Sequence, residues 1–300
     1  MTQSFLHNRE LAKYPRTPHL QGSRYQPGDK GDPVPYAELL GKTLVVEEKL
    51  DAANAGLSFD AAGQLLLQSR GHYLDVDRLG GRERQFNLFK QWARAHEGRL
   101  LDVLEDRYVV YGEFMHAKHS VYYDALPHLF CEFDIWDRQA EVFLDTPARH
   151  ALLAGVPVVS VPVLYAGLAP PRMQALQALV GPSLARTTQW RTAFEDEVAR
   201  QGLELALCWQ QTDRSELAEG LYIKVEEGGR TVGRYKLVRP DFIQTILDSQ
   251  SHHSERPVVP NRLRAGVDLF APEVDKRWPI AGGGRLCPPW RARSRPRRIS

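Results

Sequence analysis

The sequence predicts an α+β fold in which twisted antiparallel sheets carry flanking helices. Short β-rich segments separated by turn residues dominate the chain, and helical periodicity is confined to a few inserted stretches. This order differs from the regular strand-helix alternation of a parallel sheet. The 300 residues suffice for a sizeable core without disulfides.

The first strands are expected from Thr43, where TLVVEEKL, AGLSFD and QLLLQSR follow one another with turn residues between them. They predict an antiparallel meander. Residues 82–104 then predict a helix packed on the sheet. The side chains at helical spacing are Phe86, Phe89, Trp92, Ala93, His96 and Leu100.

Further strands are expected in RYVVYGEF, HLFCEFDIWD and PVVSVPVL, with a short helix around 148–154. Two more helices are predicted, through MQALQALV and through WRTAFEDEVARQG. A β-hairpin is predicted from two strands, GLYIKVEE and GRYKLVR, that are joined at Gly228 and Gly229. The segment PDFIQTILDS predicts a closing helix.

Four regions are expected along the chain. Residues 1–42, rich in Pro, Gly and charge, predict an irregular segment packed on the core, and residues 43–250 predict the main domain. A C-terminal extension, 251–272, precedes a basic tail, 273–300, whose Pro, Arg and Gly content predicts disorder. The alternative for this tail is contact with phosphate.

The cysteines and the hydropathy pattern bear on location. Cys131, Cys208 and Cys287 lie far apart and lack metal-ligand spacing, which favours free thiols in a reducing compartment over structural zinc. No stretch approaches the ~18 apolar residues of a membrane span, and the N-terminus has no apolar signal region. We therefore expect a cytoplasmic protein with no membrane partner.

The segment VVEEKLDAANAG places Lys49 and Asp51 on the same side of a strand end. A lysine beside acids is usually a surface salt bridge. Its significance comes from the charged and aromatic residues that follow in chain order, which are Arg70, Glu113, Phe133, Asp134, Glu219, Lys224 and Lys236.

This ordered set resembles the motifs of covalent nucleotidyltransferases, the superfamily of DNA ligases, RNA ligases and mRNA capping enzymes. The motifs are a KxDG-like segment, a GE segment, an aromatic-Asp segment, an EGxxxK segment and a final lysine segment. The resemblance implies an ATP-grasp-like adenylation domain. It also implies an ATP-dependent ligase in which Lys49 forms lysyl-AMP.

The resemblance assigns roles to the other residues. Glu113 and Arg70 would hold the ribose, Phe133 would stack on adenine, and Glu48 would lie near the base edge. Glu219 and Asp51 are hard-oxygen groups suited to Mg²⁺ or Mn²⁺. The last motif can be aligned with Arg234 and Lys236, which we favour, or with Lys236 and Arg239, as the phosphate-contacting pair.

The reaction requires an uncharged amine, whereas a free lysine has a pKa of about 10.4. Lys224, Lys236, Arg234 and a metal ion are expected to lower the pKa of Lys49. The same cations would stabilise charge on the phosphate oxygens.

Asn54 favours the RNA side of the superfamily, because ligases of the RNA-editing type have asparagine at this place and DNA ligases have arginine. The segments KYPRTPHL and KLVRPDF also resemble bacterial RNA-ligase-like proteins. We expect the substrate to be RNA with 5′-phosphate and 3′-hydroxyl ends, joined in RNA repair. The alternatives are a DNA ligase and a non-catalytic nucleic-acid-binding relative.

Two departures qualify this reading. Ala52 replaces the motif glycine, and alanine would be strained if that position needs a positive φ. Only about sixty residues follow Lys236, so an OB-fold is not expected. We expect the chain to rely on an end-healing or RNA-holding partner protein, or on its own basic surface.

The segment HAKHSVYYD mixes cations with aromatic residues, as nucleic-acid surfaces often do. Lys118 and His119 are its candidate RNA contacts. The alternative is an ordinary loop.

Overall fold

The computed structural model describes residues 11–25, 28–242 and 258–278. In this part of the chain ten strands form one continuous sheet with the order β3-β2-β4-β5-β6-β10-β9-β1-β8, and β7 pairs with β5. All pairings are antiparallel except β5 with β7. The strands are β1 (Thr43–Lys49), β2 (Ala53–Phe59), β3 (Leu65–Ser69), β4 (Tyr108–Phe114), β5 (Phe130–Asp137), β6 (Val142–Leu144), β7 (Val159–Ser160), β8 (Val163–Leu168), β9 (Gly220–Glu227) and β10 (Arg230–Val238).

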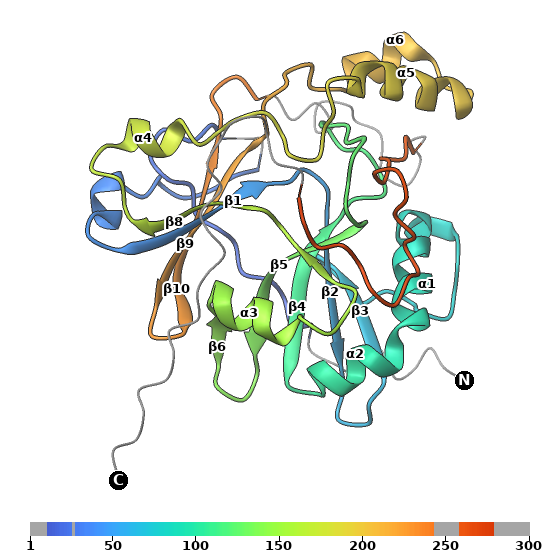
Figure 1. Cartoon of the computed structure of the whole chain (residues 1–300), viewed down its shortest axis with the longest axis horizontal. Helices are drawn as coiled ribbons and strands as arrows, with labels where there is room; N and C mark the ends of the chain where they lie inside the picture. The colour runs from blue at the N-terminus through green and yellow to red at the C-terminus, as the bar shows by residue number, and fades with distance from the viewer. Residues whose placement is uncertain (1–10, 26–27, 243–257, 279–300) are drawn as a thin grey trace.

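The helices are short and lie around this sheet, as Figure 1 shows. The predicted α+β class is therefore confirmed. The helices are the 3₁₀ turns η3 (Tyr36–Leu39) and η4 (Gly81–Phe86), and the α-helices α1 (Asn87–Ala95), α2 (Glu97–Leu104), α3 (Thr146–Leu152), α4 (Met173–Gln177), α5 (Trp190–Arg200) and α6 (Leu205–Gln210).

The helix predicted over 82–104 is divided into η4, α1 and α2. The break falls at His96, whose φ of −113° and ψ of 12° lie outside the helical range. Its buried face was predicted correctly, because Phe86, Phe89, Trp92 and Leu100 are all buried in the core.

The described core has three parts. The largest lies between α1 and α2 and the strands β2 to β5. A second joins β1, β9 and β10 to η3 and α4, and a third holds α5 and α6 against Tyr122. In Figure 1, α5 and α6 lie at one edge of the molecule, away from α1 and α2.

The hairpin predicted at Gly228 and Gly229 is present between β9 and β10. Both glycines have positive φ, 60° and 82°, a conformation that a side chain would disfavour. The turn fixes the register in which Arg234 faces Lys224 and Lys236 faces Tyr222.

The segment before β1 packs along β10. The backbone N–H of Leu20 donates to the carbonyl of Lys236, and the N–H of Lys236 donates to the carbonyl of Pro18. Leu20 is fully buried. The segment therefore extends the wall of the sheet beside Lys236, and its described residues before 36 form no helix.

The segment boundaries predicted toward the C-terminus remain predictions. The helix expected in 240–249 and the basic tail, 273–300, lie largely outside the described residues, and so does the boundary at 250. The boundary at 272–273 lies within them and stays a prediction. Among the described residues, no helix has the length and apolar character needed to cross a bilayer.

Candidate active site

Lys49 ends β1 and pairs in the ladder with Gly220, the first residue of β9. Its amine lies 2.7 Å from Oε2 of Glu219, and its side chain is 23% exposed. Glu219 is buried directly before β9. The two motifs that carry the lysine and the acid are therefore brought together by the pairing of β1 with β9.

Gly220 is required at this junction. A Cβ atom at this position would lie 2.0 Å from the carbonyl oxygen of Leu237 in β10, closer than any side chain tolerates. The close approach of the two backbones places Glu219 at the end of the sheet beside Lys49. The glycine of the EG motif thus has a steric explanation.

A cavity of about 690 Å³ opens beside Lys49. It has the size of a small-molecule site. Seven of the residues predicted for the site line it, namely Glu48, Lys49, Asn54, Arg70, Glu113, Phe133 and Lys236.

Two polar atoms in this cavity lack a hydrogen-bond partner in the described chain. They are Oδ1 of Asn54 and Oε2 of Glu113, on residues that face each other across β2 and β4. Burial raises the pKa of Glu113 to about 8. Unsatisfied polar atoms in a concave site are suited to a polar ligand.

Aromatic rings form one wall. The ring of Phe133 lies 5.8 Å from that of Tyr222 and 5.1 Å from that of Tyr14, measured between centroids. Both neighbours also line the cavity. This wall offers apolar ring surface to a base.

Tyr14 was not singled out in the sequence analysis. Its hydroxyl donates to Oδ2 of Asp134 at 2.5 Å and also contacts the hydroxyl of Tyr222. Burial, followed by the charge of Asp134, raises the pKa of Tyr14. Tyr14 lies in KYPRTPHL, a segment that resembles RNA-ligase-like sequences. The segment has no strand or helix periodicity that would distinguish Tyr14 from its neighbours.

The charge state of Lys49 differs from the expectation. Burial lowers the pKa of Lys49, but the ion pair with Glu219, assisted by Glu113 and Asp51, outweighs it, so the pKa is raised. Burial raises the pKa of Glu219 to about 7. The amine is held as an ammonium by its carboxylate neighbours in this structure.

Lys236 is the predicted phosphate-binding cation that reaches the cavity. Its amine lies 2.8 Å from Oδ1 of Asp29, whose Oδ2 lies 2.8 Å from Nε2 of His19. Burial lowers the pKa of Lys236 despite the ion pair. Asp29 and His19 were missed because they lie in the irregular N-terminal segment.

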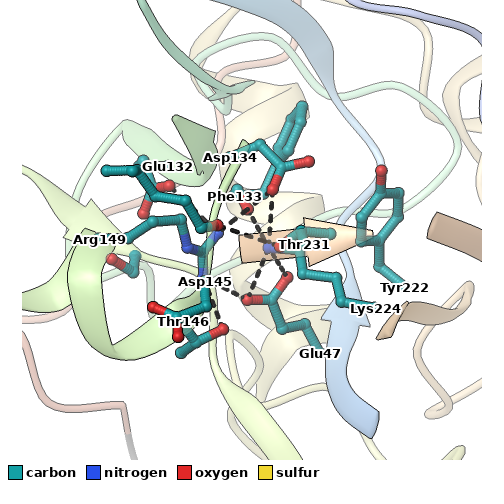
Figure 2. Close-up of polar contacts among 12 residues, drawn as sticks. Glu47, Glu132, Phe133, Asp134, Asp145, Thr146, Arg149, Tyr222, Lys224 and Thr231 are labelled. Atoms are coloured by element: carbon teal, nitrogen blue, oxygen red, sulfur yellow. Dashed lines mark hydrogen bonds and ion pairs between the residues drawn. The ribbon is translucent and has the colours of Figure 1, made fainter. Parts of the chain in front are cut away.

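Lys224 and Arg234 do not line the cavity, contrary to the prediction. Lys224 is fully buried, 3.0 Å from Glu47 and 3.2 Å from Asp134, and its amine donates to the carbonyl of Phe133 (Figure 2). The guanidinium of Arg234 lies 3.8 Å from Asp134 and 3.7 Å from the centre of the Phe143 ring. Lys224 is fully buried and Arg234 is 20% exposed, the same fraction as Lys236, but neither lies at this cavity.

Arg239, the alternative partner of Lys236, is also outside the cavity. It pairs with Asp213 and with Asp241, and its Nε donates to the carbonyl of Ala218. Neither alignment of the last motif therefore gives a pair of cations in the cavity.

Arg149 completes the buried cluster that holds Lys224. It lies 2.6 Å from Glu47 and 3.1 Å from Glu132, and all of these side chains are fully buried (Figure 2). Burial raises the pKa of Glu132, which limits the cost of placing three carboxylates beside two cations. Through the hydrogen bond from Lys224 to the carbonyl of Phe133, the cluster is bound to β5 and holds Phe133 in the cavity wall.

Asp51 and Glu48 are bound to neighbouring backbone. Oδ2 of Asp51 accepts from the N–H groups of Ser120 and Val121 at 2.7 and 2.9 Å. Glu48 accepts from the hydroxyl of Ser183 at 2.6 Å and from the N–H of Leu184 at 3.0 Å. In this structure Asp51 fixes the loop after β4, and Glu48 fixes the segment at 183–184.

The two RNA-contact candidates have different surroundings. The amine of Lys118 donates to the carbonyls of His119 and Gln211 at 2.7 and 2.5 Å, so it is occupied by the protein itself. His119 lines a second cavity beside Lys49. Only His119 remains a candidate on this geometry.

Ala52 carries no backbone strain. In the described chain the non-glycine residues with positive φ are Glu105 and Glu141. Alanine is therefore compatible with the backbone after Lys49.

The fold and the cavity define a concave polar site built around a lysine and an acid. The chain belongs to the RNA ligase family, whose profile matches residues 42–238. This range contains every predicted site residue except Arg239, the alternative partner of Lys236.

Solved structures of an RNA ligase from Naegleria gruberi resemble this chain. The structure with pyrophosphate has 18% identity and a TM-score of 0.46, covering 78% of this chain and 62% of the other. A variant with ATP and Mn has 18% identity and a TM-score of 0.46, covering 71% and 54%.

The chain spans roughly half to three-fifths of the length of these structures. No curated protein matches the chain.

Proposed function

We propose that the protein is an ATP-dependent RNA ligase whose nucleophile is Lys49. The observation that carries the proposal is the position of Lys49, beside Glu219 and in a cavity lined by six of the other predicted nucleotide-binding residues. A binder without catalysis has no need of an amine there. The unstrained backbone at Ala52 removes the one feature that favoured such a binder.

In the first step the amine of Lys49 forms a bond to the α-phosphorus of ATP, and pyrophosphate leaves. In the second, an oxygen of the RNA 5′-phosphate forms a bond to the same phosphorus, the bond to Lys49 breaks, and its amine takes up a proton. In the third, a 3′-hydroxyl attacks the activated 5′-phosphate and AMP leaves.

The cavity offers groups that fit AMP. Phe133 presents ring surface to adenine, and Glu113 and Asn54 offer unsatisfied oxygens to hydroxyl or amino donors. Arg70 lies at the same cavity with its side chain exposed to solvent. These contacts would position the α-phosphate at Lys49.

The residues present fit a divalent cation held jointly with phosphate oxygens. The described chain has no group of three or more side chains that would hold a metal by itself. Mg²⁺ is commonly bound by one or two carboxylates together with substrate phosphates, and Glu219 is the best placed carboxylate. When bound, the cation would neutralise charge on the phosphate oxygens.

The same cation would weaken the hold of Glu219 on Lys49. The amine would then lose the main interaction that raises its pKa. A neutral amine would then be available for attack on phosphorus, without Lys224 or Arg234 at the cavity.

Our proposal extends to RNA repair in the cytoplasm, with a partner that prepares or holds the RNA ends. Asn54 supports RNA over DNA through the resemblance to RNA-editing ligases. The free thiols of Cys131 and Cys208 support a reducing compartment.

Strand joining tests the proposal. The protein is incubated with ATP, Mg²⁺ or Mn²⁺, and a nicked duplex or single strands carrying a 5′-phosphate. The 3′-hydroxyl strand is RNA in one series and DNA in the other. Joining that requires RNA and is lost in Lys49→Ala supports the proposal, whereas equal joining with DNA favours a DNA ligase.

A further inference from the structure

A second cavity, of about 840 Å³, opens on the other side of the reactive lysine. It shares Lys49, Asn54, Glu113 and Lys236 with the first cavity. It then continues over the end of β3 and the 3₁₀ turn η4, where Arg82 and His72 line it. The two cavities therefore meet at the amine that would carry AMP.

Most acidic side chains of the second cavity are bound within the protein. Glu83, on its far wall, is paired with the amine of the buried Lys90 at 2.6 Å. Glu219 is paired with Lys49, and Asp29 with Lys236. These three carboxylates are therefore paired with cations of the protein. Asp51, also at this cavity, accepts from two backbone N–H groups, and burial raises the pKa of Glu113 to about 8.

Arg82 has no such partner. Its side chain is exposed, and it makes no ion pair or hydrogen bond with the described part of the chain. An unpaired guanidinium in a concave site is suited to a phosphate group, which it can contact through two N–H groups. His72, beside it, lies 3.2 Å from Oε1 of Glu83 and 2.9 Å from the hydroxyl of Ser69, so both of its ring nitrogens contact the protein.

We propose that this second cavity receives the 5′-phosphate end of the RNA strand and that Arg82 contacts its phosphate. The proposal rests on the proposed ligase function, because the strand must reach Lys49 while AMP still occupies the first cavity. The second cavity reaches Lys49 without passing through the aromatic wall at Phe133.

The test is direct binding of short RNA by the full chain without ATP. The probes are one single-stranded sequence with a fluorophore at its 3′ end, prepared with a 5′-phosphate or a 5′-hydroxyl, and the readout is fluorescence anisotropy. Arg82→Ala is compared with Arg78→Ala, which removes the same charge from an exposed neighbour outside both cavities. Urea unfolding of each variant verifies that it is folded.

Wild type is expected to prefer the 5′-phosphorylated strand. Arg82→Ala should weaken binding of that strand about tenfold, as expected for a charge-assisted contact, and abolish the preference. The slope of log Kd against log salt should fall by about one. Arg78→Ala should keep both the affinity and the preference.

Three results would overturn the proposal: no preference in the wild type, equal weakening in the two variants, or no change in Arg82→Ala. The measurement is independent of the proposed chemistry. Failure of the wild type to form lysyl-AMP would count against the ligase function, whereas these binding results judge the second cavity by itself.

Discussion

The amine of Lys49 lies 2.7 Å from Oε2 of Glu219, so the proposed nucleophile is held by a carboxylate in the structure without nucleotide. The ion pair raises the pKa of the amine against the opposing effect of burial. A charged amine cannot attack phosphorus. Release of this pair is therefore the step that would make Lys49 reactive.

Glu219→Gln should shift the titration of Lys49 to lower pH. Burial lowers the pKa of Lys49 and Glu219 raises it, so removing the carboxylate charge leaves burial less opposed. Competitive labelling with an amine reagent, read at Lys49 by mass spectrometry across pH, measures the midpoint. The control is Glu216→Gln, a nearby acid paired with Arg191, and an unchanged or higher midpoint in Glu219→Gln would contradict the account.

Asp29→Asn should strengthen binding of pyrophosphate. Asp29 lies 2.8 Å from the amine of Lys236, so an anion that uses Lys236 must compete with this carboxylate. The expected gain is about two- to fivefold, corresponding to the ~0.5–1 kcal/mol of a partly exposed ion pair. Titration calorimetry with pyrophosphate measures it, and Asp32→Asn, exposed on the same segment and outside both cavities, is the control.

Weaker binding of pyrophosphate by Asp29→Asn would mean that Asp29 positions Lys236 and does not compete with phosphate.

Arg149→Ala should destabilise the fold by ~3–5 kcal/mol, because it leaves Glu47 and Glu132 buried beside one remaining cation. Urea unfolding measures the free energy. Arg191→Ala breaks an exposed ion pair with Glu216 and should cost less than ~1 kcal/mol. Similar losses in the two variants would show that the buried cluster does not stabilise the fold as argued.

Glu113→Gln should make the stability of the nucleotide-free protein less dependent on pH. Burial raises the pKa of Glu113 from 4.5 to about 8, so the folded state binds a proton that the unfolded state has lost. Between these values wild-type stability therefore falls as pH rises through this group. Glutamine removes that contribution.

The measurement for Glu113→Gln is the urea midpoint at pH 5 and at pH 8, with the exposed Glu38→Gln as control. An equal change of midpoint with pH in wild type and Glu113→Gln would show that Glu113 is not protonated in the folded state.

The sequence was sufficient to predict the residues around Lys49. The pairing of β1 with β9 and of β2 with β4 brings Glu219, Asn54 and Glu113 to one end of the sheet. Lys49 and Glu219 lie at or beside strand ends, whereas Phe133 lies within β5. These residues were predicted from the ordered motifs, through their resemblance to the motifs of covalent nucleotidyltransferases.

The sequence did not predict which residues of a strand line the cavity and which contact the interior. Lys224 and Arg234 face each other on β9 and β10, and both contact Asp134 in the interior. A period of two gives the face of a strand but not the distance of a residue from the cavity. Tyr14 and Asp29 could not be predicted, because their segment is positioned by hydrogen bonds to distant residues.

The most direct test of the account is transfer of label from α-labelled ATP to the protein in the presence of Mg²⁺ or Mn²⁺. The protein is denatured, and the labelled residue is identified by mass spectrometry. The account predicts acid-labile AMP on Lys49 in the wild type and no label in Lys49→Ala. A folded wild type that takes no label, or label that persists in Lys49→Ala, would contradict the assignment of Lys49 as the nucleophile.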